Sequence, residues 1–148
     1  LRQIQFDHVI ANPPYFDGLA STSSFNQGRD ISRIINTPLV DWVSIMAQRL
    51  KQKGWAHLIY RVDQFDNLFT LLTPRFGSFV LTPIVPRAER EAELLIIHMR
   101  KSGKAAFRLE SPLCLHKGLK HIEDASDYTE EVEDILRGRG ALTSWQKK

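Results

Sequence analysis

The chain alternates short apolar runs with polar segments that are rich in turn residues. Val9, Ile10 and Ala11 form one such run, which is typical of a buried strand in a parallel sheet. Apolar residues then recur at helical spacing from Leu39 to Leu50. Thr37 and Pro38 suit the N-cap and first position of this helix, and Lys53-Gly54 suits its end. The run Trp55–Tyr60 predicts the next strand.

The second half of the chain predicts a helix, a strand pair and a final helix. Asp63 is expected to cap a helix that carries Phe65, Leu68, Phe69, Leu71 and Leu72 and is closed by Pro74 and Gly77. Asp127 with Glu130 is expected to form an acidic capping box. Only six residues separate two apolar runs, too few for a crossover helix, so these strands should be antiparallel. The predicted segments are strands over 78–86 and 93–99, extended pieces over 105–109 and 112–116, a helix over 127–136, and a frayed tail over 140–148.

Composition is typical of one soluble globular domain over residues 1–148. The chain has 148 residues, of which 43% are hydrophobic and 25% charged, and its net charge of +3 is compatible with an RNA partner. It contains no signal-peptide pattern and no apolar run long enough to span a bilayer, so no membrane partner is expected. A single cysteine, Cys114, allows no internal disulfide, and a cytoplasmic location is the expectation. No spacing indicates a metal site, and His57 is read as a half-buried structural histidine.

The strongest chemical signal is the segment Phe6–Tyr15, in which an apolar strand runs into Asn12-Pro13-Pro14-Tyr15. Neither proline can donate to a sheet, and each ring fixes its own φ angle. Pro14 also holds Pro13 in the extended region, so the turn is stiff. Asn12 therefore presents a side-chain acceptor at the carboxyl end of the strand, which is where α/β sheets bind their ligands.

This segment resembles motif IV of the amino-methyltransferases, which use S-adenosylmethionine (SAM) as methyl donor. The family pattern is Asn, Asp or Ser followed by Pro-Pro and an aromatic residue, with Phe-Asp at the strand start, here Phe6-Asp7. The resemblance implies that the Asn12 side chain and the Pro13 carbonyl accept hydrogen bonds from a planar NH₂ group. It also implies that Pro14 stiffens the turn, that Tyr15 stacks on the substrate, and that Asn12 contacts SAM.

A long polar segment follows the motif, from Asp17 to Asn36. Its position after the turn favours a loop that closes over a substrate. Phe16 could then add a second stacking ring, and Arg29 and Arg33 could meet phosphates or a base. The alternative interpretation is an ordinary surface loop with incidental arginines.

Within that family, the chain is most similar to bacterial tRNA (adenine-N6)-methyltransferases that modify the adenine beside the anticodon of valine tRNA. Besides the motif, the similarity rests on the run Leu94–Lys101 and on the segment Asp127–Glu131. It implies an α/β fold: the C-terminal half of a Rossmann-like class I methyltransferase sheet, mostly parallel, with a terminal antiparallel hairpin. None of the eight glycines forms the Gly-rich loop that holds SAM in this class. The chain is therefore expected to be the C-terminal part of such an enzyme, without its SAM-binding half.

Three functions stay open at this stage. The first is SAM-dependent N6-methylation of adenine in RNA, with tRNA as the expected substrate. The second is N5-methylation of a glutamine in release factors, because an amide nitrogen can be held by the same two acceptors. The third is a non-catalytic module derived from a methyltransferase. The sequence does not determine the oligomeric state.

Overall fold

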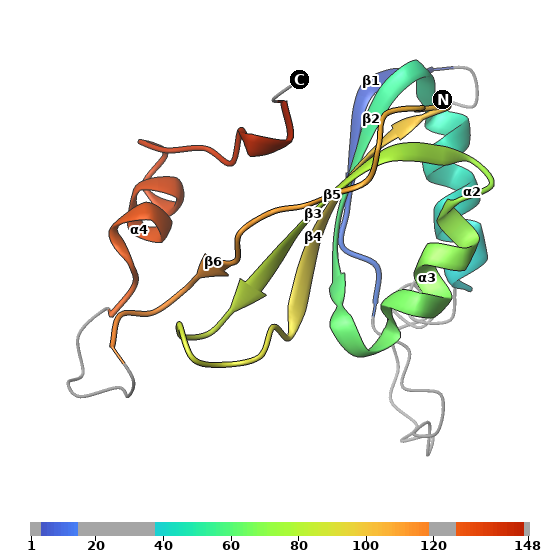
Figure 1. Ribbon diagram of the computed structural model, residues 1–148. Helices are drawn as coiled ribbons and strands as arrows, with labels where there is room; N and C mark the ends of the chain where they lie inside the picture. Colours follow the sequence, from blue (N-terminus) through green and yellow to red (C-terminus); the bar gives the residue numbers. More distant parts are fainter. Residues whose placement is uncertain (1–3, 15–37, 119–126, 147–148) are drawn as a thin grey trace, which may run out of the picture.

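The computed structural model describes residues 4–14, 38–118 and 127–146 (Figure 1). A mixed sheet forms its centre, with helices on one side and the C-terminal segment on the other (Figure 1). The elements are β1 (Phe6–Ala11), α2 (Leu39–Arg49), β2 (Leu50–Arg61), the short helical turn η1 (Val62–Gln64), α3 (Phe65–Leu72), β3 (Phe76–Val85), β4 (Leu94–Lys101), β5 (Arg108–Leu109), β6 (Leu113–Cys114), α4 (Glu130–Leu136) and the short helical turn η2 (Ser144–Gln146).

The strand order in the sheet is β1-β2-β4-β3-β5, and β6 also pairs with β3. β1 and β2 are parallel, whereas β4 is antiparallel to both of its neighbours, β2 and β3. The predicted antiparallel pair is therefore confirmed, and its second strand lies between β2 and β3. The two extended pieces predicted after the pair form β5 and β6, both parallel to β3.

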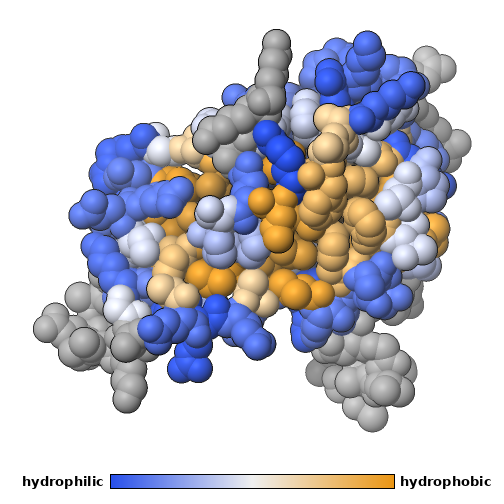
Figure 2. Space-filling view, in the orientation of Figure 1, coloured by the Kyte–Doolittle hydropathy of each residue, from blue (hydrophilic) through white to orange (hydrophobic). Residues whose placement is uncertain are grey.

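The core lies between the sheet and the two long helices. Apolar side chains at helical spacing on α2 and α3 face alternate residues of the central strands, which project to one side of the sheet. The most buried members are Val43, Met46, Leu50, Ala56, Leu58, Tyr60, Leu68, Leu72, Ile97 and Met99. In Figure 2 apolar side chains gather over the region where Figure 1 shows the sheet and α3, with hydrophilic side chains around them.

The expectation that Val9–Ala11 is a buried strand is only partly met. Val9 and Ala11 pack against the core, but Ile10 points to the other face of the sheet and is 81% exposed. Within the described residues, β1 pairs with β2 alone and is an edge strand. An apolar run of this kind suits a strand that is buried on both faces of a sheet. In the described chain, helices cover only one face of this strand.

The helix predicted to run to Lys53 ends earlier. α2 stops at Arg49, because Leu50 is extended (φ −83°, ψ 136°) and its side chain is fully buried beneath the helices. Residues 51–54 then bulge out of the β1–β2 pairing, with Lys53 at φ 63°. At the other end Pro38 occupies the N-cap position, one residue later than predicted, and Thr37 lies outside the described residues.

Both predicted carboxylate caps are wrong. η1 precedes α3, and the carboxylate of Asp63 binds Arg61 instead of a helix N-terminus. α4 begins at Glu130 with Thr129 as its N-cap, whose hydroxyl accepts from the Val132 N–H at 3.4 Å. In each case a nearby arginine offers the carboxylate an opposite full charge as well as hydrogen bonds, whereas the backbone N–H groups at a cap carry only partial charges. Arg87 is that arginine for Asp127.

The tail predicted to be frayed contains the turn η2, and its Trp145 packs on the sheet. The Trp145 Nε1–H donates to the Leu142 carbonyl at 2.9 Å, which fixes the ring. Within the described residues, no helix combines the length and apolar character needed to cross a membrane.

Candidate functional site

The diproline turn lies at the carboxyl end of β1, directly after Ala11. Pro13 is less than 2% exposed, and Pro14 is partly buried. Asn12 is exposed, and within the described chain its side chain makes no hydrogen bond. A buried proline ring therefore anchors the turn, and the exposed amide before it makes no hydrogen bond within the described chain.

β2 ends at the same edge of the sheet, because it runs parallel to β1. There the Arg61 Nε donates to Asp63 Oδ1 at 2.9 Å, and a second contact joins the Arg61 NH2 group to Asp63 Oδ2. The hydrogen bonds and the charge of Arg61 lower the pKa of Asp63 below its usual value. Asp63 is therefore an ionised carboxylate and a weak base at neutral pH.

Four of the predicted site residues cannot be placed. Tyr15, Phe16, Arg29 and Arg33 lie outside the described residues, so their stacking and phosphate-binding roles stay predictions. The described part of the predicted site is therefore the pair of acceptors on Asn12 and Pro13, with Pro14 behind them.

A row of three histidines crosses the face of the sheet opposite α2 and α3. His8 Nδ1 lies 3.0 Å from His57 Nε2, and His57 Nδ1 lies 2.7 Å from His98 Nδ1. His57 is half-buried and hydrogen-bonded, which confirms the expectation that it is a structural histidine. The row itself was missed, because strand alternation shows which residues share a face but not which strands become neighbours.

Two imidazoles of this row, those of His57 and His98, have lowered pKa values. Burial, and then the proximity of His57, lowers the pKa of His98 from 6.5 to about 4. Burial and the proximity of His8 also lower the pKa of His57. Trp145 stacks on His98 with its centroid 5.4 Å away, which keeps water from that ring. Among the described residues, no group of His, Cys, Asp and Glu side chains is arranged to hold a metal ion.

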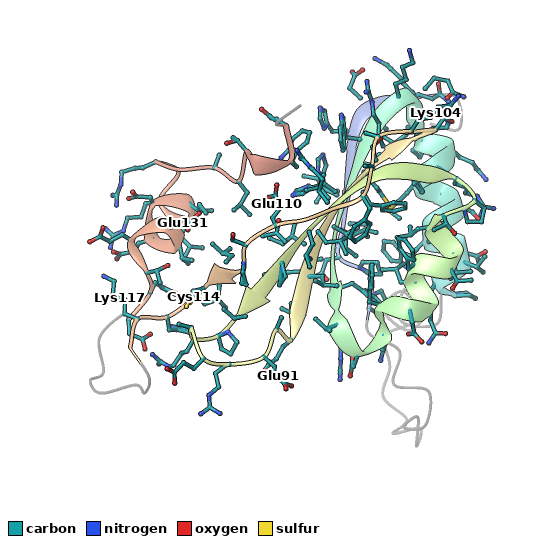
Figure 3. The ribbon with its side chains drawn as sticks, viewed as in Figure 1. Glu91, Lys104, Glu110, Cys114, Lys117 and Glu131 are labelled. Carbon is teal, nitrogen blue, oxygen red and sulfur yellow. The ribbon has the colours of Figure 1, made fainter. Side chains whose placement is uncertain are left out.

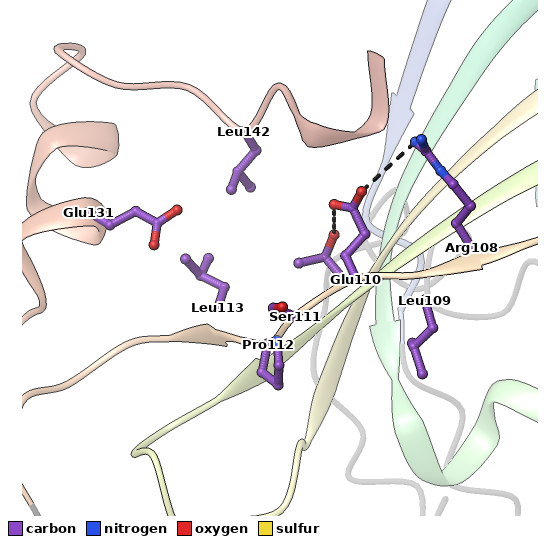
Figure 4. Close-up of a pocket in the computed structure, with 9 residues that line it drawn as sticks. Arg108, Leu109, Glu110, Ser111, Pro112, Leu113, Glu131 and Leu142 are labelled. Carbon is purple, nitrogen blue, oxygen red and sulfur yellow. Dashed lines mark hydrogen bonds and ion pairs between the residues drawn. The ribbon is translucent and has the colours of Figure 1, made fainter. Parts of the chain in front are cut away.

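Two cavities lie away from the diproline turn, and Asn12 lines neither of them. The first, of about 590 Å³, lies between the sheet and α4. Glu131 from α4 and Glu110 from the segment after β5 face this region (Figure 3). Figure 4 shows Leu113 and Leu142 closing it from β6 and the tail, and the Glu110 carboxylate in contact with Arg108 at 3.8 Å. The second cavity, of about 540 Å³, lies beside Trp55 and Trp145.

Among the solved structures that are similar to this chain is one that aligns with most of it. The crystal structure of a predicted O-methyltransferase, protein Atu636 from Agrobacterium tumefaciens, matches with 26% identity and a TM-score of 0.68. That alignment covers 93% of this chain and 53% of the other, so the chain spans about half the length of that protein. The crystal structure of an M1.HpyAVI-SAM complex aligns less well, with 14% identity, a TM-score of 0.40, and coverage of 79% and 60% of the two chains.

No protein-family model matches the chain, and no curated protein matches it. The sheet of this chain is mixed, and its strand β4 is antiparallel to both of its neighbours. Over the part that these residues span, the chain has a Rossmann-like methyltransferase fold.

Proposed function

We propose that the protein is a SAM-dependent methyltransferase that transfers a methyl group to N6 of adenine in RNA, with tRNA as the expected substrate. One observation carries this proposal. Asn12 is exposed and makes no hydrogen bond within the described chain, at the carboxyl edge of a methyltransferase-type sheet, while Pro13 beside it is buried. A turn that served only to end a strand would not need a polar side chain without a protein partner at the ligand-binding edge.

The two acceptors explain how a poor nucleophile could react. The lone pair of an adenine NH₂ group is delocalised into the ring, so the nitrogen attacks weakly. If Asn12 Oδ1 and the Pro13 carbonyl each accept a hydrogen bond from one N–H of this group, the nitrogen is drawn toward tetrahedral geometry. Its lone pair then points at the methyl group. The rate advantage then comes mainly from placing the reacting atoms in line.

The carboxylate at this edge also favours an amine acceptor over a hydroxyl. Methylation of a hydroxyl needs a base to remove its proton, whereas an amine can lose its proton after methyl transfer. Asp63 is held ionised by Arg61 and its pKa is lowered, which makes it a weak base. The printed name of the Agrobacterium protein describes a predicted O-methyltransferase, so this distinction has to be tested directly.

SAM would supply the methyl group from its sulfonium centre. In this proposal Asn12 would also contact the donor, because ligands of α/β sheets bind at the carboxyl edge of the strands. The 148 residues contain no Gly-rich loop after a strand to hold the rest of SAM. The assay therefore uses the full-length protein.

The deciding experiment incubates the full-length protein with methyl-labelled SAM and, separately, total tRNA or purified release factor. The proposal expects label in tRNA, recovered as N6-methyladenosine after digestion and mass spectrometry. Label in glutamine of the release factor would support the second function instead. Ribose-methylated or other O-methylated nucleosides would contradict the amine chemistry, and the absence of label in every substrate would favour a non-catalytic module.

Replacing Asn12 with Ala should reduce kcat by about 10²-fold, by analogy with the removal of one transition-state hydrogen-bonding group. The matched control is Asn67→Ala, because Asn67 is exposed on α3 and has no proposed role. Asn12→Asp retains an acceptor oxygen and should keep more activity than Asn12→Ala. Equal turnover of Asn12→Ala and the wild type would remove Asn12 from the mechanism.

A further inference from the structure

A second cavity lies on the face of the sheet opposite α2 and α3, away from the diproline turn. Its volume is about 540 Å³, within the range of small-molecule sites. Val80 and Ser78 of β3 lie on one side, and Ala105, Ala106 and Gln146 lie around it. The remaining lining residues are two tryptophans and two arginines: Trp55, Trp145, Arg100 and Arg108.

The aromatic walls of this cavity are held rigidly. The centroids of Trp55 and Trp145 are 5.0 Å apart, with the ring planes inclined at 61°. One side of Trp145 stacks on buried His98, and its indole N–H is bound to the Leu142 carbonyl. Rings that are already fixed lose little entropy when a flat ligand packs on them, so they suit stacking.

The polar groups of the cavity are cationic. The Arg100 guanidinium lies 5.7 Å from the centroid of Trp55, and its Nε donates to the Lys53 carbonyl at 2.8 Å. Arg108 donates to the Trp145 carbonyl at 3.2 Å and lies 3.8 Å from Glu110, which partly balances its charge. None of the described residues that line the cavity is acidic. The site therefore combines flat apolar surfaces with an excess of positive charge.

We infer that this cavity binds one nucleotide of a single-stranded nucleic acid. The base would pack against the tryptophans, and the phosphate would be bound by Arg100, whose planar guanidinium suits phosphate oxygens. Trp55 lies opposite His8 in the β1–β2 pairing, and His8 is four residues before Asn12, so this wall of the cavity is about 13 Å along the strand from Asn12. The inference goes beyond methyl transfer, since it concerns a separate binding site.

The test measures binding of adenosine monophosphate (AMP) to the wild-type chain by quenching of tryptophan fluorescence, without SAM. A Trp42→Phe background removes the tryptophan on α2 and leaves both cavity tryptophans as reporters. We expect saturable quenching by AMP, with a Kd below about 1 mM, and at least about tenfold weaker binding of adenosine, which lacks the phosphate. Quenching that does not saturate, or equal affinity for AMP and adenosine, would overturn the inference.

Variants then locate the site. Arg100→Gln should weaken AMP binding about tenfold, and Arg100→Lys should restore part of it, because the charge returns without the planar fork. Arg139→Gln is the matched control, since Arg139 is an exposed arginine paired with Asp134 outside the cavity. Unchanged AMP binding in Arg100→Gln would also overturn the inference. If that variant misfolds, the comparison of AMP with adenosine on the wild-type chain tests the inference instead. AMP binding is measured without SAM and without methyl transfer, so failure of this inference and failure of the proposed function are separable.

Discussion

His98 is 5% exposed and forms the inner end of the histidine row. Its Nδ1 faces His57, whereas its Nε2 is buried and has no hydrogen-bond partner among the described residues. A charged imidazole in this position would lose hydration and would be repelled by His57, and the attraction of Glu110 does not offset these effects, so the pKa of His98 falls to about 4. The consequence is a dependence of stability on pH.

The free energy of unfolding should rise between about pH 4 and 6.5. Because the folded-state pKa of His98 is about 4 and the unfolded value is 6.5, the unfolded chain binds more protons in this window. The contribution of His98 to the free energy of unfolding is fully present above pH 6.5. It falls by about 3 kcal/mol as the pH decreases toward 4. Urea denaturation between pH 4.5 and 7 measures it.

His98→Phe should flatten this dependence, since it keeps a ring against Trp145 but cannot be protonated. The lowered pKa of His57 acts in the same direction, so a smaller slope should remain. Asp7 and Asp63 also have lowered pKa values, but their effect falls below about pH 4 and does not interfere. A wild type and variant with the same slope would show that His98 is not the titrating group.

At the scale of elements, α2 is held by one stripe of side chains. Val43 is fully buried against the sheet, whereas Val40, one turn earlier, is 42% exposed. The helix has no side-chain cap at its start, where Pro38 precedes it. Packing of the stripe is therefore the main reason that this segment is helical.

Val43→Ala should lower the free energy of unfolding by about 2 kcal/mol, because it removes two buried methyl groups and leaves a cavity. Val40→Ala makes the same chemical change on the same helix and should cost less than about 0.5 kcal/mol. Chemical denaturation of both variants measures the difference. Equal losses would mean that α2 does not pack as described.

At the scale of the molecule, one ion-pair network ties the C-terminal segment to the sheet. Arg87, just after β3, donates to Asp127 Oδ2 at 2.6 Å and also to the Lys117 carbonyl. Asp127 Oδ1 lies 2.5 Å from His116 Nδ1, and the Thr129 hydroxyl donates to the Cys114 carbonyl at 2.9 Å. These contacts are partly buried, so they are less screened than surface pairs.

Asp127→Asn should loosen the C-terminal segment by about 1.5–3 kcal/mol, the usual worth of hydrogen bonds to a charged group. Hydrogen exchange should show lost protection over residues 113–116 and 128–136 with little change in α2. Asp134→Asn is the control, because its pair with Arg139 is exposed and should contribute less than about 1 kcal/mol. Loss of protection across the whole sheet would instead indicate global unfolding.

The sequence by itself determined the order and type of most elements and the candidate chemistry. Alternating and helical spacing located the strands and helices, the short charged turn required antiparallel pairing, and two adjacent prolines fixed the turn at Asn12. These features depend on neighbours along the chain, so local rules suffice for them.

Only the tertiary structure decided the rest. It placed His8, His57 and His98 in one row, drew Asp63 and Asp127 to arginines instead of helix ends, and ended α2 early by burying Leu50. It also brought Trp145 against Trp55, from segments ninety positions apart in the numbering. Each outcome depends on which strands become neighbours and on which side chains the packed core covers. The spacing of residues along the chain does not determine either of these.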